Sequence, residues 1–191
     1  MDKTITFIRH GKTAGNLTNC YIGITDEQLT IEGEKDILDR SYPEADIVFV
    51  SPLSRCIRTA EIIYPSLDPV VIDELRETNF GSFEGKNYKD LSSNPDYQRW
   101  IDSGGDLPFP GGESKQEATA RALIGFDKLL ELSKDYYNIS VVAHGGTIMG
   151  ILSHIFGGDY YSYHVENCEG YTIDLSHDGI FSGLYPRSFR R

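Results

Sequence analysis

Apolar residues gather along the chain in short runs, separated by longer stretches in which apolar and polar residues alternate at helical spacing. Each run is rich in β-branched or aromatic residues and is bounded by polar or turn-forming residues, a pattern typical of buried strands. The runs that predict strands are 4–8, 47–50, 70–72, 139–143 and, as the last strand, 171–175.

The stretches between these runs carry helix start signals, and the helices that they predict are 30–38, 51–63, 114–134 and 147–156. Thr30 and Ser51 are suitable N-caps, and Pro52 suits the first helical position. Ser114 and Glu117 form a capping box before apolar residues at helical spacing. The glycines at 145–146 predict a tight turn before the last helix.

Residues 79–113 differ in composition from the rest of the chain. Glycine and proline alternate there with aromatic residues, which predicts loops with one short helix around 97–101. The segment stands between a predicted strand and a capped helix. We therefore expect a small insertion that forms a lid over a site and contacts the leaving group of a substrate.

Strands that are apolar on both faces and alternate with helices predict an α/β fold, a three-layer sandwich with a mostly parallel central sheet. The length of 191 residues fits one domain over 1–191. In such sheets ligands bind beyond the carboxyl ends of the strands. The residues that follow the predicted strands are therefore the first candidates for chemistry.

The chain carries 18 basic and 29 acidic residues, a formal net charge of −11. An acidic surface repels nucleic-acid backbones and anionic lipid heads, so we expect neither nucleic acid nor membrane as a partner. No apolar stretch approaches the roughly 20 residues of a membrane span, and no signal-peptide pattern opens the chain, so the expected location is cytoplasmic. The 3 cysteines have no CxxC spacing and predict neither a disulfide framework nor a zinc site.

Polar clusters follow three of the predicted strands. Two of them are Arg9-His10-Gly11 and His144-Gly145-Gly146, and the third, after 47–50, contains Arg55. Two imidazoles and two guanidiniums at one sheet edge match the oxygens of a phosphoryl dianion. Neighbouring guanidiniums also lower the pKa of an imidazole and keep it neutral, so His10 or His144 is a candidate nucleophile that accepts a phosphoryl group.

These residues belong to an ordered set of motifs. The set comprises Arg9-His10-Gly11-Lys12-Thr13 with Asn16; Gly23, Asp26, Leu29-Thr30 and Gly33; Ser51-Pro52-Leu53 with Arg55 and Thr59-Ala60; Leu75-Arg76-Glu77, Phe80-Gly81 and Phe83-Glu84-Gly85; Gly111-Gly112-Glu113-Ser114; and Val141-Val142-Ala143-His144-Gly145-Gly146. Through them most of the chain resembles the histidine phosphatase superfamily, in its phosphoglycerate mutase-like branch. The resemblance implies a phosphoglycerate mutase-like fold.

The catalytic residues that the resemblance implies are His10, Arg9, Arg55, His144 and Glu77. The substrate-binding residues that it implies are Asn16, Gly23 and Gly145. His10 would be the phosphorylated nucleophile, and Glu77 the acid that protonates the leaving alkoxide and then takes a proton from water. Glu84 and Glu113 are alternative acids, and Arg58, one helical turn from Arg55, is the alternative guanidinium.

We expect a metal-independent phosphomonoester hydrolase that acts on small phosphorylated metabolites through a phosphohistidine intermediate. No cofactor is required if arginine and histidine neutralise the phosphoryl charge, and His144, His154 and His164, spaced ten apart, fit no common metal-ligand pattern. The stretch 75–85 resembles bacterial enzymes assigned to α-ribazole phosphate and also their broad-specificity relatives, which makes α-ribazole 5'-phosphate one candidate substrate. A homodimer is the candidate assembly.

Two alternatives belong to other classes of protein. A cofactor-dependent phosphoglycerate mutase would share the His10 chemistry, but such mutases surround their bisphosphate with additional basic residues. The segment 79–113 contains only Lys86, Lys89 and Arg99. The second alternative is a phosphate-binding regulator without catalysis, although every residue that the mechanism needs is present.

Overall fold

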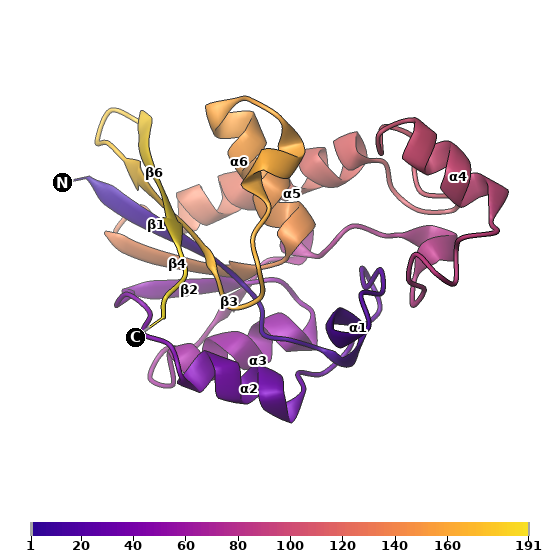
Figure 1. Cartoon of the computed structure of the whole chain (residues 1–191). Helices are drawn as coiled ribbons and strands as arrows, with labels where there is room; N and C mark the ends of the chain where they lie inside the picture. Colours follow the sequence, from indigo (N-terminus) through magenta and orange to yellow (C-terminus); the bar gives the residue numbers. More distant parts are fainter. Residues whose placement is uncertain (1, 191) are drawn as a thin grey trace.

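The computed structural model describes residues 2–190, which form a six-stranded sheet with helices on both faces (Figure 1). The strands are β1 (Lys3–Arg9), β2 (Ile47–Val50), β3 (Val70–Val71), β4 (Asn138–Ala143), β5 (Gly170–Leu175) and β6 (Phe181–Arg187), in the order β3-β2-β4-β1-β5-β6. The first four in this order pair in parallel, whereas β5 pairs antiparallel with both β1 and β6. The predicted α/β fold with a mostly parallel sheet is confirmed.

The helices are α1 (Ala14–Leu17), α2 (Ile31–Leu38), α3 (Ser54–Ile63), α4 (Pro95–Asp102), α5 (Lys115–Leu132) and α6 (Gly145–Phe156), with 3-10 turns at Asp73–Leu75, Gly81–Phe83 and Tyr160–Tyr163. The predicted caps are confirmed at two helices. Thr30 accepts from the Gly33 amide at the start of α2, and Ser114 forms a capping box with Glu117 at the start of α5.

Four details of the sequence prediction are wrong. Ser51 and Pro52 do not begin α3, whose N-cap is Leu53; the Ser51 hydroxyl accepts from the Leu53 amide at 3.4 Å and lies 2.7 Å from Nε2 of His144, the residue after β4. The glycines at 145–146 form no separate turn but the first turn of α6. The chain also contains the short helix α1, and β6 follows β5 as the last strand.

The sheet is buried on both faces, which produces three layers (Figure 1). On one face α5 and α6 pack on the sheet through residues such as Phe126, Leu129 and Ile151. On the other face α3 packs through Cys56 and Ala60, and α2 lies beside α3. Within residues 2–190, every helix is too short or too polar to cross a lipid bilayer.

The register of the parallel strands places three carboxyl ends together. Arg9 pairs with Ala143 across β1 and β4, and Val50 pairs with Val142 across β2 and β4. The residues that follow these strands therefore emerge side by side at one edge of the sheet.

The insertion 79–113 extends from this edge and carries α4, which lies away from the sheet in Figure 1. It has a small core of its own, in which Phe83, Leu91 and Phe109 are buried. Tyr21, from outside the insertion, stands among its aromatic rings, with centroids 5.3 Å from Phe80 and 6.2 Å from Trp100. These contacts tie the insertion to the loop that follows α1.

Candidate active site

His10 follows β1 and lies in the buried floor of the site. Its Nδ1 is 2.7 Å from the carbonyl oxygen of Gly11, and its Nε2 is 3.3 Å from Nε of Arg55. A carbonyl only accepts and a guanidinium only donates, so the proton of the neutral ring is on Nδ1 and the lone pair is on Nε2. Burial, then the charges of Arg55 and Arg9, lowers the pKa of His10 well below its ordinary value.

Arg55 is fully buried in the first turn of α3. Its guanidinium donates to the carbonyls of Thr25 and Gly23, at 2.8 Å and 2.7 Å, and its Nε faces His10. Arg58 instead lies on the outer side of α3, where it pairs with Glu34 and Glu61. The structure therefore brings Arg55, and not Arg58, to the crevice.

His144 follows β4 as the N-cap of α6 and lies edge-on to His10, with ring centroids 5.1 Å apart. Its Nε2 is 2.7 Å from the Ser51 hydroxyl, at the carboxyl end of β2. Burial, then Arg55, lowers the pKa of His144 well below its ordinary value. Ser51 is thus a site residue that sequence reasoning interpreted as a helix cap, although its place in the Ser51-Pro52-Leu53 motif could have identified it.

Arg9 is the last residue of β1, directly before His10, and it borders a pocket that Glu77 also lines. Its Nη1 donates to the carbonyl of Val165 at 2.7 Å, whereas its buried Nε has no hydrogen-bond partner within residues 2–190. Burial lowers the pKa of Arg9. Because an unpaired buried donor is costly, this N–H is suited to an incoming anionic oxygen.

Glu77 borders the same pocket, with 7% of its surface exposed. Main-chain N–H groups hold its carboxylate, because Thr78 donates to Oε1 at 2.8 Å and Gly146 donates to Oε2 at 3.1 Å. A Cβ at Gly146 would lie 2.4 Å from Oε1 of Glu77, so the second glycine after His144 leaves room for the carboxylate. The site thus places the Glu77 carboxyl at the N-terminus of α6, within reach of main-chain donors.

The two alternative acids are committed elsewhere. Glu84 accepts from four donors around the loop after α1, namely the amides of Gly23, Ile24 and Phe80 and the Thr25 hydroxyl. Glu113 accepts from Arg121 through both oxygens, at 2.8 Å and 2.7 Å. Neither lines the pocket that Arg9 and Glu77 border. The geometry therefore favours Glu77 as the carboxyl that meets substrate.

The three predicted substrate contacts differ in position. Gly145 lines the pocket, and its amide belongs to the first turn of α6. Gly23 has both main-chain groups engaged, with its amide on Glu84 and its carbonyl on Arg55. Asn16 accepts from the Thr13 amide and from Asn167 through Oδ1.

Asn167 is a residue that sequence reasoning missed. Its amide nitrogen donates to the main-chain oxygen of His10 at 2.9 Å and to Oδ1 of Asn16 at 3.2 Å. It lies in the connection before β5, 157 residues from His10 along the chain. No local pattern in the sequence marks it, because only the fold brings that connection to the end of β1.

A pocket of about 220 Å³ extends from Arg9 and Glu77 toward the insertion. Its aromatic lining consists of Tyr21, Phe80, Trp100, Phe109, Tyr160 and Tyr161. Lys115 also borders it, with Nζ 2.6 Å from an Asp106 oxygen and 5.7 Å from the centre of the Tyr161 ring. The pocket is therefore polar where Arg9 and Glu77 border it and aromatic at the insertion end, while His10, Arg55 and His144 are buried and are not among its lining residues.

Residues 2–190 contain no group of three or more His, Cys, Asp or Glu side chains arranged to hold a metal ion. His154 and His164 do not join His144, which is buried against Ser51 and Cys56. The site instead brings two guanidiniums, two neutral imidazoles and a helix N-terminus together at one edge of the sheet. Such an arrangement can bind a phosphoryl group and present to it a nitrogen with a free lone pair.

Comparisons with known proteins agree with this geometry. Residues 5–184 match the family described as the histidine phosphatase superfamily (branch 1). The chain is 32% identical over 164 residues to a 2,3-bisphosphoglycerate-dependent phosphoglycerate mutase of Cytophaga hutchinsonii, covering 79% of this chain and 76% of that protein. It is 33% identical over 166 residues to the uncharacterized phosphatase PhoE of Bacillus subtilis, covering 81% and 78%.

The fold itself also has solved counterparts. The crystal structure of the alpha-ribazole phosphatase from Shigella flexneri superposes with a TM-score of 0.86, covering 98% of this chain and 97% of that one at 24% identity. This likeness shows a shared phosphoglycerate mutase-like fold. The relatives divide between mutases and phosphatases, so the reaction must be argued from the site.

Proposed function

Because the chain belongs to branch 1 of the histidine phosphatase superfamily, we propose that it is a phosphomonoester hydrolase acting through a phosphohistidine intermediate. The family implies a small phosphorylated molecule as substrate. The observation that supports the proposed intermediate is the geometry of His10, whose Nδ1–H is held by the Gly11 carbonyl while Nε2 keeps its lone pair beside Arg55.

In the first step, Nε2 of His10 attacks phosphorus and the bond between phosphorus and the ester oxygen breaks. Glu77 gives its proton to the departing oxygen, which leaves as an alcohol. In the second step, Glu77 takes a proton from a water molecule that attacks the phosphohistidine, and the products are inorganic phosphate and free His10. Arg9 and Arg55 neutralise the phosphoryl oxygens throughout, so the proposed mechanism needs no metal ion.

The lining of the pocket favours hydrolysis over the mutase reaction. A mutase must hold a second anionic group of its substrate, which requires further cations near the pocket. The three cations of the insertion are elsewhere: Lys86 donates to the Ser82 carbonyl, Lys89 lies by the Tyr88 ring, and Arg99 pairs with Asp96. Among the described residues that line the pocket, Lys115 is the one lysine or arginine besides Arg9, and it is already paired with Asp106.

We further propose that the insertion 79–113 acts as a lid that selects the leaving group. The wall that it contributes includes Trp100 and Phe109, whose rings stack with centroids 4.9 Å apart. Aromatic walls favour a leaving group with a flat apolar part. α-Ribazole 5'-phosphate, which carries an aromatic base, is the candidate of this kind.

The test is release of inorganic phosphate from a panel of esters in EDTA, between pH 5 and 8. The panel contains p-nitrophenyl phosphate, 3-phosphoglycerate and α-ribazole 5'-phosphate. We expect release from several esters, with the aromatic ones preferred. Conversion of 3-phosphoglycerate to 2-phosphoglycerate with a bisphosphate primer, and no phosphate release, would instead identify a mutase. Activity that is lost in EDTA and returns with a divalent ion would contradict the metal-free mechanism.

A further inference from the structure

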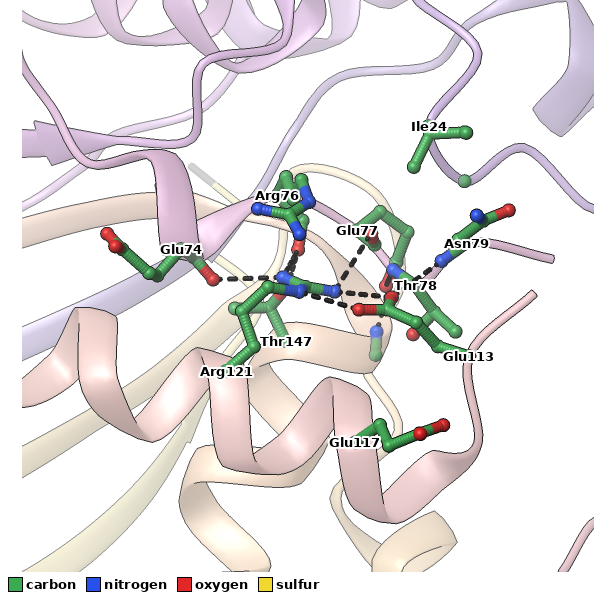
Figure 2. A network of polar contacts seen from close by, with 12 residues as sticks. Ile24, Glu74, Arg76, Glu77, Thr78, Asn79, Glu113, Glu117, Arg121 and Thr147 are labelled. Atoms are coloured by element: carbon green, nitrogen blue, oxygen red, sulfur yellow. Dashed lines mark hydrogen bonds and ion pairs between the residues drawn. The ribbon is translucent and has the colours of Figure 1, made fainter. Parts of the chain in front are cut away.

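Arg121 lies in the middle of α5, and its side chain is only 11% exposed. It makes no contact with the pocket, yet all five N–H donors of its guanidinium are engaged (Figure 2). Nε and Nη2 bind the two oxygens of Glu113, at 2.8 Å and 2.7 Å. The remaining donors bind the main-chain oxygens of Glu74, Arg76 and Glu77, at 3.0 Å, 2.7 Å and 3.2 Å.

Those three carbonyls belong to the segment that presents Glu77 to the pocket. Glu74 lies in the 3-10 turn Asp73–Leu75 and the chain after this turn has no regular structure, and within residues 2–190 no main-chain amide is bound to these three carbonyls. Buried main-chain oxygens need donors. Arg121 donates to the oxygens of Arg76 and Glu77, which belong to the two peptide groups on either side of the Glu77 Cα. The Thr147 hydroxyl also donates to the Arg76 oxygen, at 3.3 Å.

Glu113 extends the same network to the insertion. Its Oε2 accepts from the Asn79 amide at 2.9 Å, and its own amide donates to the Asn79 oxygen at 2.9 Å. Asn79 and Glu113 thus join the two ends of the insertion. Burial alone would raise the pKa of Glu113, but the hydrogen bonds from Arg121 and from the Asn79 amide outweigh it and lower this pKa, so Glu113 stays ionised.

We propose that the Arg121–Glu113 pair is a positioning element for the reaction, which fixes the main chain of Glu77 and so aims its carboxyl at the leaving group. The inference rests on the proposed role of Glu77 as acid and base. Arg121 touches neither the pocket nor His10, so it acts through Glu77. A lysine cannot replace it, because an ammonium group has three donors on one atom and cannot span Glu113 and three carbonyls.

Two esters whose leaving groups differ in basicity can distinguish a positioning role of Arg121 from a role in the stability of the fold. An alkyl alcohol leaves poorly without a proton, whereas p-nitrophenolate leaves readily without one. We would measure alcohol or phenol release in the first turnover, for p-nitrophenyl phosphate and for the alkyl phosphate that the wild type hydrolyses fastest. The variants are Arg121→Lys, Glu113→Gln, Glu77→Gln and the double variant of Arg121→Lys with Glu77→Gln. Arg58→Lys, on the outer side of α3, is the matched control.

We expect Arg121→Lys to slow the alkyl ester about 100-fold, the cost of misplacing a reacting group by about 1 Å, and to slow p-nitrophenolate release less than about threefold. Inhibition by inorganic phosphate should be unchanged, because Arg9, Arg55 and His144 remain. Adding Arg121→Lys to Glu77→Gln should cause no further loss of rate, because the Arg121–Glu113 pair acts only through the Glu77 carboxyl, which Glu77→Gln has already removed. Glu113→Gln should likewise slow the alkyl ester much more than p-nitrophenyl phosphate. If Arg121→Lys does not fold, this variant tests the positioning role in its place.

Equal losses with both esters, or additive losses in the double variant, would overturn the positioning role and leave Arg121 as a purely structural residue. A failure of the proposed function would give a different result: the wild type itself would release phosphate from neither ester.

Discussion

The Nε–H of Arg55 faces Nε2 of His10 across 3.3 Å, in a floor where both side chains are buried. In the proposed mechanism, the group that receives a phosphoryl oxygen and the group that attacks phosphorus are therefore in direct contact before substrate arrives. The Gly11 carbonyl holds the opposite nitrogen of the ring at 2.7 Å. The nucleophile is thus oriented from both sides, which reduces the entropy that the reaction must overcome.

Replacing His10 by alanine should abolish turnover and leave phosphate binding. Arg9, Arg55 and His144 remain to hold inorganic phosphate weakly, whereas no lone pair is left to attack. Rapid quench into alkaline denaturant, in which the P–N bond of phosphohistidine survives, should trap a phosphorylated protein with the wild type and none with His10→Ala. Phosphate release at the wild-type rate from this variant would refute the assignment of the nucleophile.

The stability of the protein should decrease as the pH falls below about 6.5. Burial and the neighbouring arginines lower the pKa of His10 and of His144 in the folded state, whereas the unfolded chain binds these protons near pH 6.5. The contribution of each neutral ring is therefore complete above pH 6.5. It decreases by about 1.4 kcal/mol per pH unit as the pH falls toward the folded pKa.

Urea unfolding between pH 5 and 7 measures this dependence. The variant His10→Gln should have a slope smaller by about 1.4 kcal/mol per pH unit than the wild type. Identical slopes would mean that His10 titrates alike in both states.

Arg55→Lys should impair both stability and activity, in contrast to Arg58→Lys. The lysine leaves buried carbonyls, among them those of Gly23 and Thr25, without donors, and each such loss costs about 1–3 kcal/mol. Arg58 forms exposed ion pairs, whose replacement changes the free energy of unfolding by less than about 0.5 kcal/mol. Urea unfolding and phosphate release on the two variants check this contrast, and equal effects would contradict the assignment of Arg55 to the site.

Trp100→Ala should change the ranking of substrates more than the rate of phosphoryl transfer to His10. The ring belongs to the aromatic wall of the pocket, and an aromatic contact contributes about 0.5–1.5 kcal/mol beyond its buried area. We expect kcat/KM to fall about tenfold for an aryl ester and much less for a small alkyl ester. Tyr88→Ala, at an exposed ring of the same insertion, is the control. A uniform loss would indicate that the insertion only supports the fold.

Local patterns predicted much of the fold because they report local physics. Capping boxes and apolar runs depend on neighbours in sequence, and Thr30, Ser114 and the strand cores lie where these patterns indicate. Ser51 shows the limit of such reasoning. Its local context is that of a helix cap, but the hydroxyl binds His144, 93 residues away, because β2 and β4 are adjacent.

The candidate site was predictable to the same extent. The types of the site residues and their positions after predicted strands could be inferred from local patterns: His10 after one strand, His144 after another, Arg55 in the helix after a third. The fold was needed to establish which lone pair of His10 is free, that Glu84 and Glu113 bind other groups, and that Asn167 and Arg121 contact the main chain of His10 and Glu77. Hydrogen bonds between distant segments depend on strand register and helix packing, which no local stretch of sequence specifies.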